Sequence, residues 1–158
     1  MKKLLKAEIV LLTQSAQMLT PIQITYDDKK IDPNPKYEIS LIYDAVEYSG
    51  TGKDYLWTDT LADLQVNLPK DVRIACCMTC KHGNMCPYGN PVNQLFCTKD
   101  CIINSKEDMC RLFDQTNPFD ERAVAALSFC QSFEYQNDGY YTYNDYLYHL
   151  NQKNKNAK

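Results

Sequence analysis

Several features of common functional classes are missing from this chain of 158 residues. No run of apolar residues approaches the roughly 20 that a membrane-spanning helix needs, so we expect no membrane segment. The net charge is only −3, which argues against strong non-specific attraction to nucleic acid. The turn-like segment at 49–53, SGTGK, lacks the full GxxxxGKS/T pattern, so it does not indicate a phosphate-binding loop.

Histidine is also scarce, with only His82 and His149 in the whole chain. No local signature pairs either of them with a nucleophilic cysteine. His82 could act as a metal ligand or support one, but a histidine in such a loop is more often simply exposed. The carboxylates are scattered as on a solvated surface. We therefore assign no catalytic residue, and an enzyme is the less favoured interpretation.

Sulfur, in contrast, is abundant: six of the eight cysteines lie between residues 75 and 101. The first residues begin like a signal peptide, but Lys6 and Glu8 interrupt the apolar run. We interpret this segment as the first β-strand of a cytoplasmic protein. Disulfides rarely persist in the cytoplasm, so clustered cysteines are better explained as metal ligands or redox groups.

Cys77 and Cys80 form a C-x-x-C pair, at which two thiolates can bind one ion while backbone N–H groups hydrogen-bond the sulfurs. Cys97 is the third candidate ligand. Structural zinc takes four ligands in a tetrahedron, and the spacing leaves the fourth open. The choices are Cys86, a second knuckle formed by Cys97 and Cys101, or the distant Cys130. We interpret Cys76, Cys101 and Cys110 as small buried hydrophobes.

An iron–sulfur cluster is the main alternative to zinc. The spacing C-x2-C-x5-C overlaps the beginning of known cluster motifs, but the next cysteine of such a motif would fall at Asn90. The chain shows no large barrel domain that could use such a cluster. A thioredoxin-type redox pair is also disfavoured, because Cys77 and Cys80 lack a βαβ context. The ligand types therefore favour zinc.

The hydrophobic pattern predicts an α+β fold. Strands are expected at 6–12, 22–26, 37–48 and 72–77. Helices are expected at 54–68, 105–113 with Ser105 as N-cap, and 119–133 with Asp120 as N-cap. These elements give an N-terminal antiparallel sheet with a packed helix, a zinc-bearing loop segment at 76–101 and C-terminal helices. We expect residues 1–150 to form one domain and 151–158 to be a disordered tail.

The chain resembles a bacterial domain family of similar length and unknown activity. The resemblance covers roughly residues 55–140 and is carried by the segments TDTLADLQVNLP, CCMTC, CPYG, LFC and FCQSFE. It places a Pro-x-Gly turn at 87–89 and implies four recurrent cysteines, namely Cys77, Cys80, Cys97 and Cys130. It therefore makes Cys130 the first choice for the fourth ligand, with Cys86 as runner-up. The extra cysteines of this chain depart from the family pattern.

These observations lead to three functional hypotheses. The first is a zinc-stabilised cytoplasmic module that binds another protein without catalysis. A bacterial toxin-immunity protein is its most specific form, suggested by size and charge alone. The second is a zinc enzyme in which Cys77, Cys80 and Cys97 bind the ion and water takes the fourth, open position. The third is a zinc-ribbon-like nucleic-acid-binding module, which the small positive charge of the cysteine segment disfavours.

Overall fold

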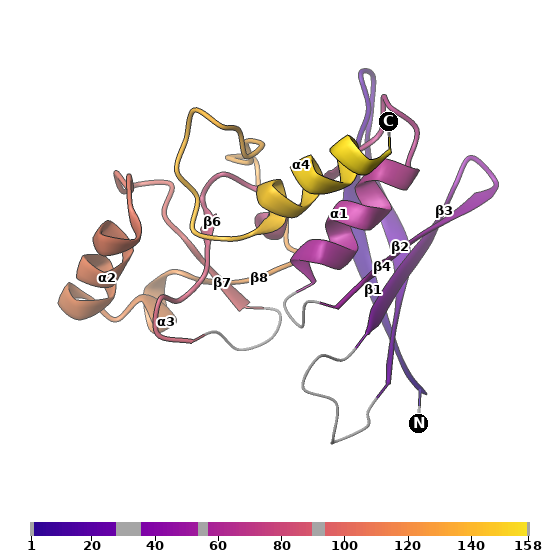
Figure 1. Cartoon of the computed structure of the whole chain (residues 1–158). Helices are drawn as coiled ribbons and strands as arrows, with labels where there is room; N and C mark the ends of the chain where they lie inside the picture. Colours follow the sequence, from indigo (N-terminus) through magenta and orange to yellow (C-terminus); the bar gives the residue numbers. More distant parts are fainter. Residues whose placement is uncertain (1, 28–35, 54–56, 90–93, 158) are drawn as a thin grey trace. The chain divides into compact units, whose positions relative to one another are not determined.

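The structure is a computed structural model that describes residues 2–27, 36–53, 57–89 and 94–157 (Figure 1). The chain divides into two compact units. The first consists of Met1–Ile74 and Asp145–Lys158, and the second of Ala75–Asn144. Among the described residues, no helix combines the length and the apolar character needed to cross a membrane.

The first unit contains a five-stranded sheet in the order β4-β3-β2-β1-β5. Its strands are β1 (Lys2–Leu12), β2 (Gln17–Asp27), β3 (Tyr37–Tyr43), β4 (Val46–Gly52) and β5 (Arg73–Ala75). Strands β1 to β4 pair in sequence order, and each pair is antiparallel. The expected α+β class and N-terminal antiparallel sheet are confirmed.

Alternation of apolar and polar residues explains which face of the sheet is buried. Ile22 and Ile24 of β2 are buried while Gln23 between them is exposed. The register sets Ile24 opposite Ile39 of β3, and Ile22 opposite Leu41. These side chains therefore share one face, as a period of two requires, and they form the core of the first unit.

The expected single strand at 37–48 is wrong, because the chain reverses within it. Asp44 and Ala45 have φ values of 50° and 61°, the left-handed conformation that a two-residue hairpin turn needs at both central positions. Strand β4 then continues through Gly52, so the segment 49–53 does not form the expected turn. The usual glycine or asparagine signal is missing at the real turn, where alanine is an uncommon occupant.

Helix α1 (Thr58–Asn67) lies against β4 and β3 of the sheet (Figure 1). The predicted apolar stripe is confirmed, since Trp57, Leu61, Leu64 and Leu68 are all buried. Residues 54–56 of that helix prediction lie outside the described residues. The helix approaches β4 so closely that a Cβ at Gly50 would lie 2.2 Å from the backbone nitrogen of Leu64.

The outer edge of β4 is closed by side chains of α1. The backbone N–H of Thr51 donates to Asp63 Oδ2 at 2.9 Å, and Asn67 Nδ2 donates to the carbonyl oxygen of Ser49 at 2.9 Å. These groups are the ones that antiparallel pairing with β3 leaves pointing outward. Another strand would therefore have to displace helix side chains before it could pair with β4.

Helix α4 (Tyr146–Asn156) packs beside α1 in the same unit (Figure 1). Lys153 Nζ lies 2.9 Å from Asp59 Oδ1 and 3.2 Å from Asp63 Oδ1, and His149 Nδ1 lies 3.7 Å from Asp59 Oδ1. The expectation of a disordered tail at 151–158 does not match this helix, which extends to Asn156. Its polar composition hid the contacts that its lysine makes with α1.

The second unit is built from short elements: a 3₁₀ helix η1 (Cys77–Thr79), strands β6 (Gly83–Asn84), β7 (Gln94–Cys97) and β8 (Ala123–Ala125), and helices α2 (Lys106–Gln115) and α3 (Pro118–Glu121). Strands β6, β7 and β8 form an antiparallel sheet in that order. The ring of Phe96 contacts those of Phe113 and Phe119 at centroid distances of 4.9 and 5.0 Å, which forms an aromatic core.

One of the two helices expected in this unit is confirmed and the other is wrong. The hydroxyl of Ser105 accepts a hydrogen bond from the backbone N–H of Asp108, so Ser105 caps α2 as predicted. The helix expected at 119–133 ends at Glu121, and Ala123–Ala125 instead form β8 and pair with β7. Pairing with a strand distant in sequence therefore overrode the helical spacing of this segment.

We predict that Gly50→Ala lowers the free energy of unfolding by about 2 kcal/mol or more, because its Cβ would overlap the backbone of α1. Chemical denaturation followed by circular dichroism measures the loss. Ser49→Ala is the matched control, since this neighbouring side chain is exposed and should change stability little. Equal stability of the two variants would contradict the close approach of α1 to β4.

We predict that Lys153→Met destabilises the protein at neutral pH by about 0.5 to 1 kcal/mol, a modest amount because the ion pair is partly exposed. Burial raises the pKa of Asp59, but the Lys153 and Lys53 N–H groups and the nearby positive charges outweigh it, so the pKa lies below 3.8. A carboxylate with a lowered pKa stabilises the fold above its unfolded value and loses that effect as pH falls.

The difference in stability between Lys153→Met and the unchanged chain should therefore shrink as pH falls below 3.8. Lys155→Met is the control on the same helix, because Lys155 is exposed and forms no described ion pair. Urea unfolding over a pH series makes the comparison. A difference that persists undiminished in acid would show that Lys153 acts through packing and not through Asp59.

Candidate metal centre

Cys77 and Cys80 are held by a tight turn around η1. The backbone N–H of Cys80 donates to the carbonyl oxygen of Cys77 at 3.3 Å, and the N–H of Gly83 donates to that of Cys80 at 3.0 Å. Cys76 precedes the turn, and its backbone N–H donates to the Thr79 hydroxyl at 3.1 Å. This compact turn holds Cys77, the first residue of η1, and Cys80, the residue that follows its end, within a single helical turn, as a metal knuckle requires.

Cys97 comes to this turn through the pairing of β6 with β7. It lies directly opposite Gly83 in the antiparallel register. The pairing continues past the strand, because the N–H of Thr98 donates to the carbonyl oxygen of His82 at 3.1 Å. Gly83 is required here, since a Cβ on it would lie 1.8 Å from the carbonyl oxygen of Cys77.

Cys130 comes from a third segment, 126–136, which runs alongside the turn. The N–H of Cys77 donates to the carbonyl oxygen of Ser128 at 2.7 Å, and that of Met78 donates to the carbonyl oxygen of Ala126 at 2.9 Å. At the far end of the turn, the N–H of Lys81 donates to the carbonyl oxygen of Glu134 at 2.8 Å. Cys130 lies between these anchor points in the sequence.

Buried amide side chains fix the same arrangement. Gln136 Nε2 donates to the carbonyl oxygen of Met78 at 2.9 Å and to Asn144 Oδ1 at 3.0 Å. Asn144 Nδ2 in turn donates to the carbonyl oxygen of Gly83 at 2.6 Å. The sequence analysis missed both residues, because an isolated Gln or Asn carries no motif that marks it as structural.

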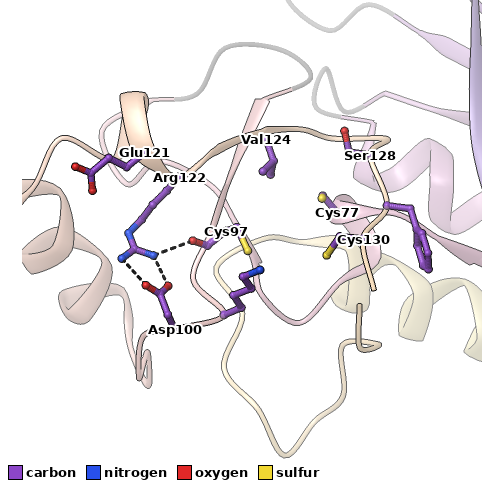
Figure 2. A pocket seen from close by; sticks show the side chains of 10 residues that line it. Cys77, Cys97, Asp100, Glu121, Arg122, Val124, Ser128 and Cys130 are labelled. Carbon is purple, nitrogen blue, oxygen red and sulfur yellow. Dashed lines mark hydrogen bonds and ion pairs between the residues drawn. The ribbon is translucent and has the colours of Figure 1, made fainter. Parts of the chain in front are cut away.

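Four cysteines from these three segments border one small cavity of about 20 Å³. It is lined by Cys77, Cys80, His82, Gly83, Cys97, Lys99, Val124, Cys130 and Ser132. The four include every first-choice ligand from the sequence, whereas the runner-up Cys86 is not in the lining. A larger cavity of about 590 Å³ adjoins three of them, Cys77, Cys97 and Cys130, as Figure 2 shows.

The thiols are not arranged as a finished coordination sphere. Within the described parts of the chain, no three His, Cys, Asp or Glu side chains are placed so that together they could hold a metal ion. The donor chemistry nevertheless fits zinc, which binds four thiolates readily. Binding one ion would require these side chains to turn toward one another about their Cα–Cβ bonds.

One further side chain beside the thiols, that of His82, also lines the small cavity. His82 is only 11% exposed in its side chain, so the expectation of an exposed histidine is wrong. Its Nδ1 is buried and has no hydrogen-bond partner among the described residues, while Nε2 lies 3.6 Å from Glu134 Oε1. A buried orphan nitrogen is unusual, and a thiolate in the cavity would give it an acceptor.

Burial and neighbouring thiols favour the neutral form of Cys77. Burial, with smaller contributions from the thiols of Cys76, Cys80, Cys130 and Cys97, raises the pKa of Cys77 from 9.0 to about 12. Burial likewise raises the pKa of Cys80, with smaller contributions from Cys97 and Cys130. A cation would reverse this preference, because it stabilises the thiolate form that binds it.

A pair of opposite charges borders the larger cavity. The guanidinium of Arg122 forms an ion pair with Asp100 and also donates to the carbonyl oxygen of Cys97 at 3.2 Å (Figure 2). The hydrogen bond from Arg122 holds the pKa of Asp100 at about 2. Arg122 thus links the end of β7 to the segment that precedes β8, and it helps to position Cys97.

The remaining cysteines lie elsewhere in the second unit. Cys76 is completely buried, as expected of a small hydrophobe. Cys101 and Cys110 are only half-buried, so that interpretation is wrong for them in part. Cys86 is buried.

Comparison with known proteins identifies no relative of this chain: no family model, no curated protein and no solved structure matches it.

We predict that Gly83→Ala destabilises the second unit by about 3 kcal/mol, because the added methyl group would overlap the carbonyl of Cys77. Gly139→Ala is the control in the same unit, since the nearest atom there is a side-chain oxygen at 3.2 Å. Hydrogen exchange at residues 77–84, read by mass spectrometry, localises the effect. Unchanged protection there would argue against the described turn.

Proposed function

We propose that Cys77, Cys80, Cys97 and Cys130 bind one structural Zn²⁺, and that the chain is a cytoplasmic module that binds another protein without catalysis. The observation that carries this proposal is the small cavity of about 20 Å³, because all four thiols border it although they come from distant parts of the sequence. Four thiolates would complete a tetrahedral sphere and leave no position for substrate or water.

The size of the elements supports a structural role for the ion. Strand β6 has two residues and β8 has three, and sheets of such short strands are marginally stable without further support. An ion bound by Cys77 and Cys130 would close a long loop and reduce the entropy of the unfolded chain. The binding free energy of zinc would then add directly to the stability of the second unit.

One observation favours a second candidate, a zinc enzyme with an open coordination position. The cavity of about 590 Å³ borders Cys77, Cys97 and Cys130 but not Cys80. A substrate in that cavity would lie beside these three thiols, and it could reach a bound ion only if one thiol left the coordination sphere. Thiolate-rich zinc with an open position supports catalysis only where a water or substrate replaces the fourth ligand.

Protein binding and the cytoplasmic location are the less specific parts of the proposal. They are supported by the absence of any catalytic signature and by the reduced cysteines that a cytoplasmic metal site needs. A toxin-immunity role is one form of this hypothesis by analogy with other small acidic proteins. Nucleic-acid binding is not favoured, because the net charge of the chain is −3.

We predict that the untagged protein purifies with one zinc per chain, measured by elemental analysis against protein concentration. Single replacements by serine at Cys77, Cys80, Cys97 and Cys130 should each lower zinc affinity by about tenfold or more, because serine is a poor ligand for zinc. Cys110→Ser is the matched control and should retain zinc. Cys86→Ser tests the runner-up ligand.

Three outcomes would contradict the structural zinc site. If the purified protein contained no transition metal, the zinc site would be contradicted. Finding the cysteines paired in disulfides would contradict it as well. If Cys86→Ser lost zinc and Cys130→Ser kept it, the fourth ligand would be Cys86 and not Cys130. Cobalt substitution separates the two candidate functions, since its visible spectrum distinguishes four sulfur ligands from three sulfurs and one oxygen.

A further inference from the structure

The second edge of the large sheet differs from the edge that α1 closes. At the turn between β1 and β2, the N–H of Thr13 donates to the carbonyl oxygen of Ala16 at 2.9 Å. The register continues from this pair, so odd-numbered residues of β1 form the hydrogen-bonded pairs with β2. The backbone N–H and C=O groups of Lys2, Leu4 and Lys6 therefore point to the other side of β1.

Strand β5 can cover only a small part of that side. It has three residues, whereas β1 has eleven. Ile74 and Ala75 of β5 are buried, which matches the buried residues 9–11 of β1 and not the segment 2–6. Every side chain from 2 to 6 is exposed, and no other strand in the described residues extends the sheet beyond β5. Among the described residues, the outward backbone groups of Lys2, Leu4 and Lys6 thus form the part of this edge that the short strand β5 leaves uncovered.

The side chains on this edge indicate what could pair with it. Lys2, Lys3 and Lys6 make it basic, and Leu4 and Leu5 are 53% and 45% exposed. Among the described residues, Asp27 lies opposite Lys2 on β2, and Glu8 follows the basic stretch on β1.

A second copy of the chain is a poor occupant in the register that pairs residues 2–6 with the same residues of the copy. Antiparallel self-pairing centred on Leu4 would set Lys2 directly opposite Lys6, and like charges in that position are destabilising. A strand with acidic residues at the two positions that face Lys2 and Lys6, and an apolar residue between them facing Leu4, would satisfy both the charges and the apolar surface.

We propose that an extended acidic segment of a partner protein adds to the sheet as a strand along residues 2–6 of β1. The inference rests on the protein-binding part of the proposed function and names the chemistry of the partner. It does not depend on the metal. Main-chain hydrogen bonds to Lys2, Leu4 and Lys6 would supply affinity, and the lysines would select the acidic sequence.

The test measures fluorescence anisotropy of labelled, end-blocked peptides added to the full-length, zinc-loaded chain. The probe is a peptide in which Glu and Val alternate at every second residue with Thr between them, as in Glu-Thr-Val-Thr-Glu, so that Glu faces Lys2 and Lys6 while Val faces Leu4. Three matched peptides serve as controls. In the first, Gln replaces Glu, and in the second, Lys replaces Glu. The third keeps the glutamates and carries two prolines, which remove backbone N–H donors. The protein variants are Leu4→Pro, the double charge reversal Lys2→Glu with Lys6→Glu, and Lys70→Glu, an exposed control away from β1.

The acidic peptide should bind saturably, and the double reversal should weaken it by about tenfold or more while Lys70→Glu changes little. The basic peptide should bind only the double-reversed protein. Leu4→Pro should abolish binding with an unchanged circular dichroism spectrum, because the lost N–H is not used in pairing with β2. Should Leu4→Pro prove less folded, the double reversal decides alone.

Binding that is absent, that the proline peptide retains, or that the double reversal leaves unchanged would overturn the inference. Zinc content is measured on the same samples, so the two proposals fail separately. If the protein contains zinc but does not bind the peptide, only the strand-addition proposal is wrong. If the protein contains no metal but binds the peptide, only the zinc proposal is wrong.

Discussion

The second unit depends on the hydrogen bonds that join residues 77–81 to residues 126–136. They connect η1 to a segment about fifty residues away in the sequence, through the N–H groups of Cys77, Met78 and Lys81. Without them, β6, β7 and β8 would be a small sheet of very short strands, which is marginally stable by itself. The same bonds bring Cys130 to the C-x-x-C turn. The proposed ion would therefore reinforce an arrangement that the backbone already specifies, and would not have to create it.

The two units are stabilised by different kinds of interaction. The first has strands of up to eleven residues and buries an alternating row of aliphatic side chains beneath α1. The second satisfies its buried backbone through amide side chains such as Gln136 and Asn144, because it has few regular elements to do so. A small unit that relies on polar networks gains most from a bound metal. The cysteines occur where this requirement is greatest.

The elements that were predictable from the sequence are those in which local pattern and tertiary contact agree. The stripe of α1 and the Ser105 cap of α2 are of this kind, because each depends on residues three or four positions apart. The turn at Asp44 and Ala45 carries no glycine, so nothing local revealed it. The helix expected at 119–133 failed because pairing of β8 with β7 is a long-range contact. For the candidate site, the spacing of the cysteines indicated Cys77, Cys80 and Cys97. The choice of Cys130 rested on the family resemblance. Gln136 and His82 could be assigned only from the fold.

The two edges of the large sheet show why the basic stretch of β1 requires a functional explanation. Lysine on an edge strand is a common protection against aggregation, and Lys2 and Lys6 could serve that purpose alone. Protection, however, gains nothing from two adjacent exposed leucines, which increase the tendency of an open edge to associate. The chain also has another way to close an edge, since Asp63 and Asn67 of α1 occupy the backbone groups of β4. An edge that keeps outward backbone groups uncovered, its leucines exposed and lysines at Lys2 and Lys6 is suited to selective pairing. The lysines then exclude a second copy and attract an acidic strand by the same electrostatic interaction.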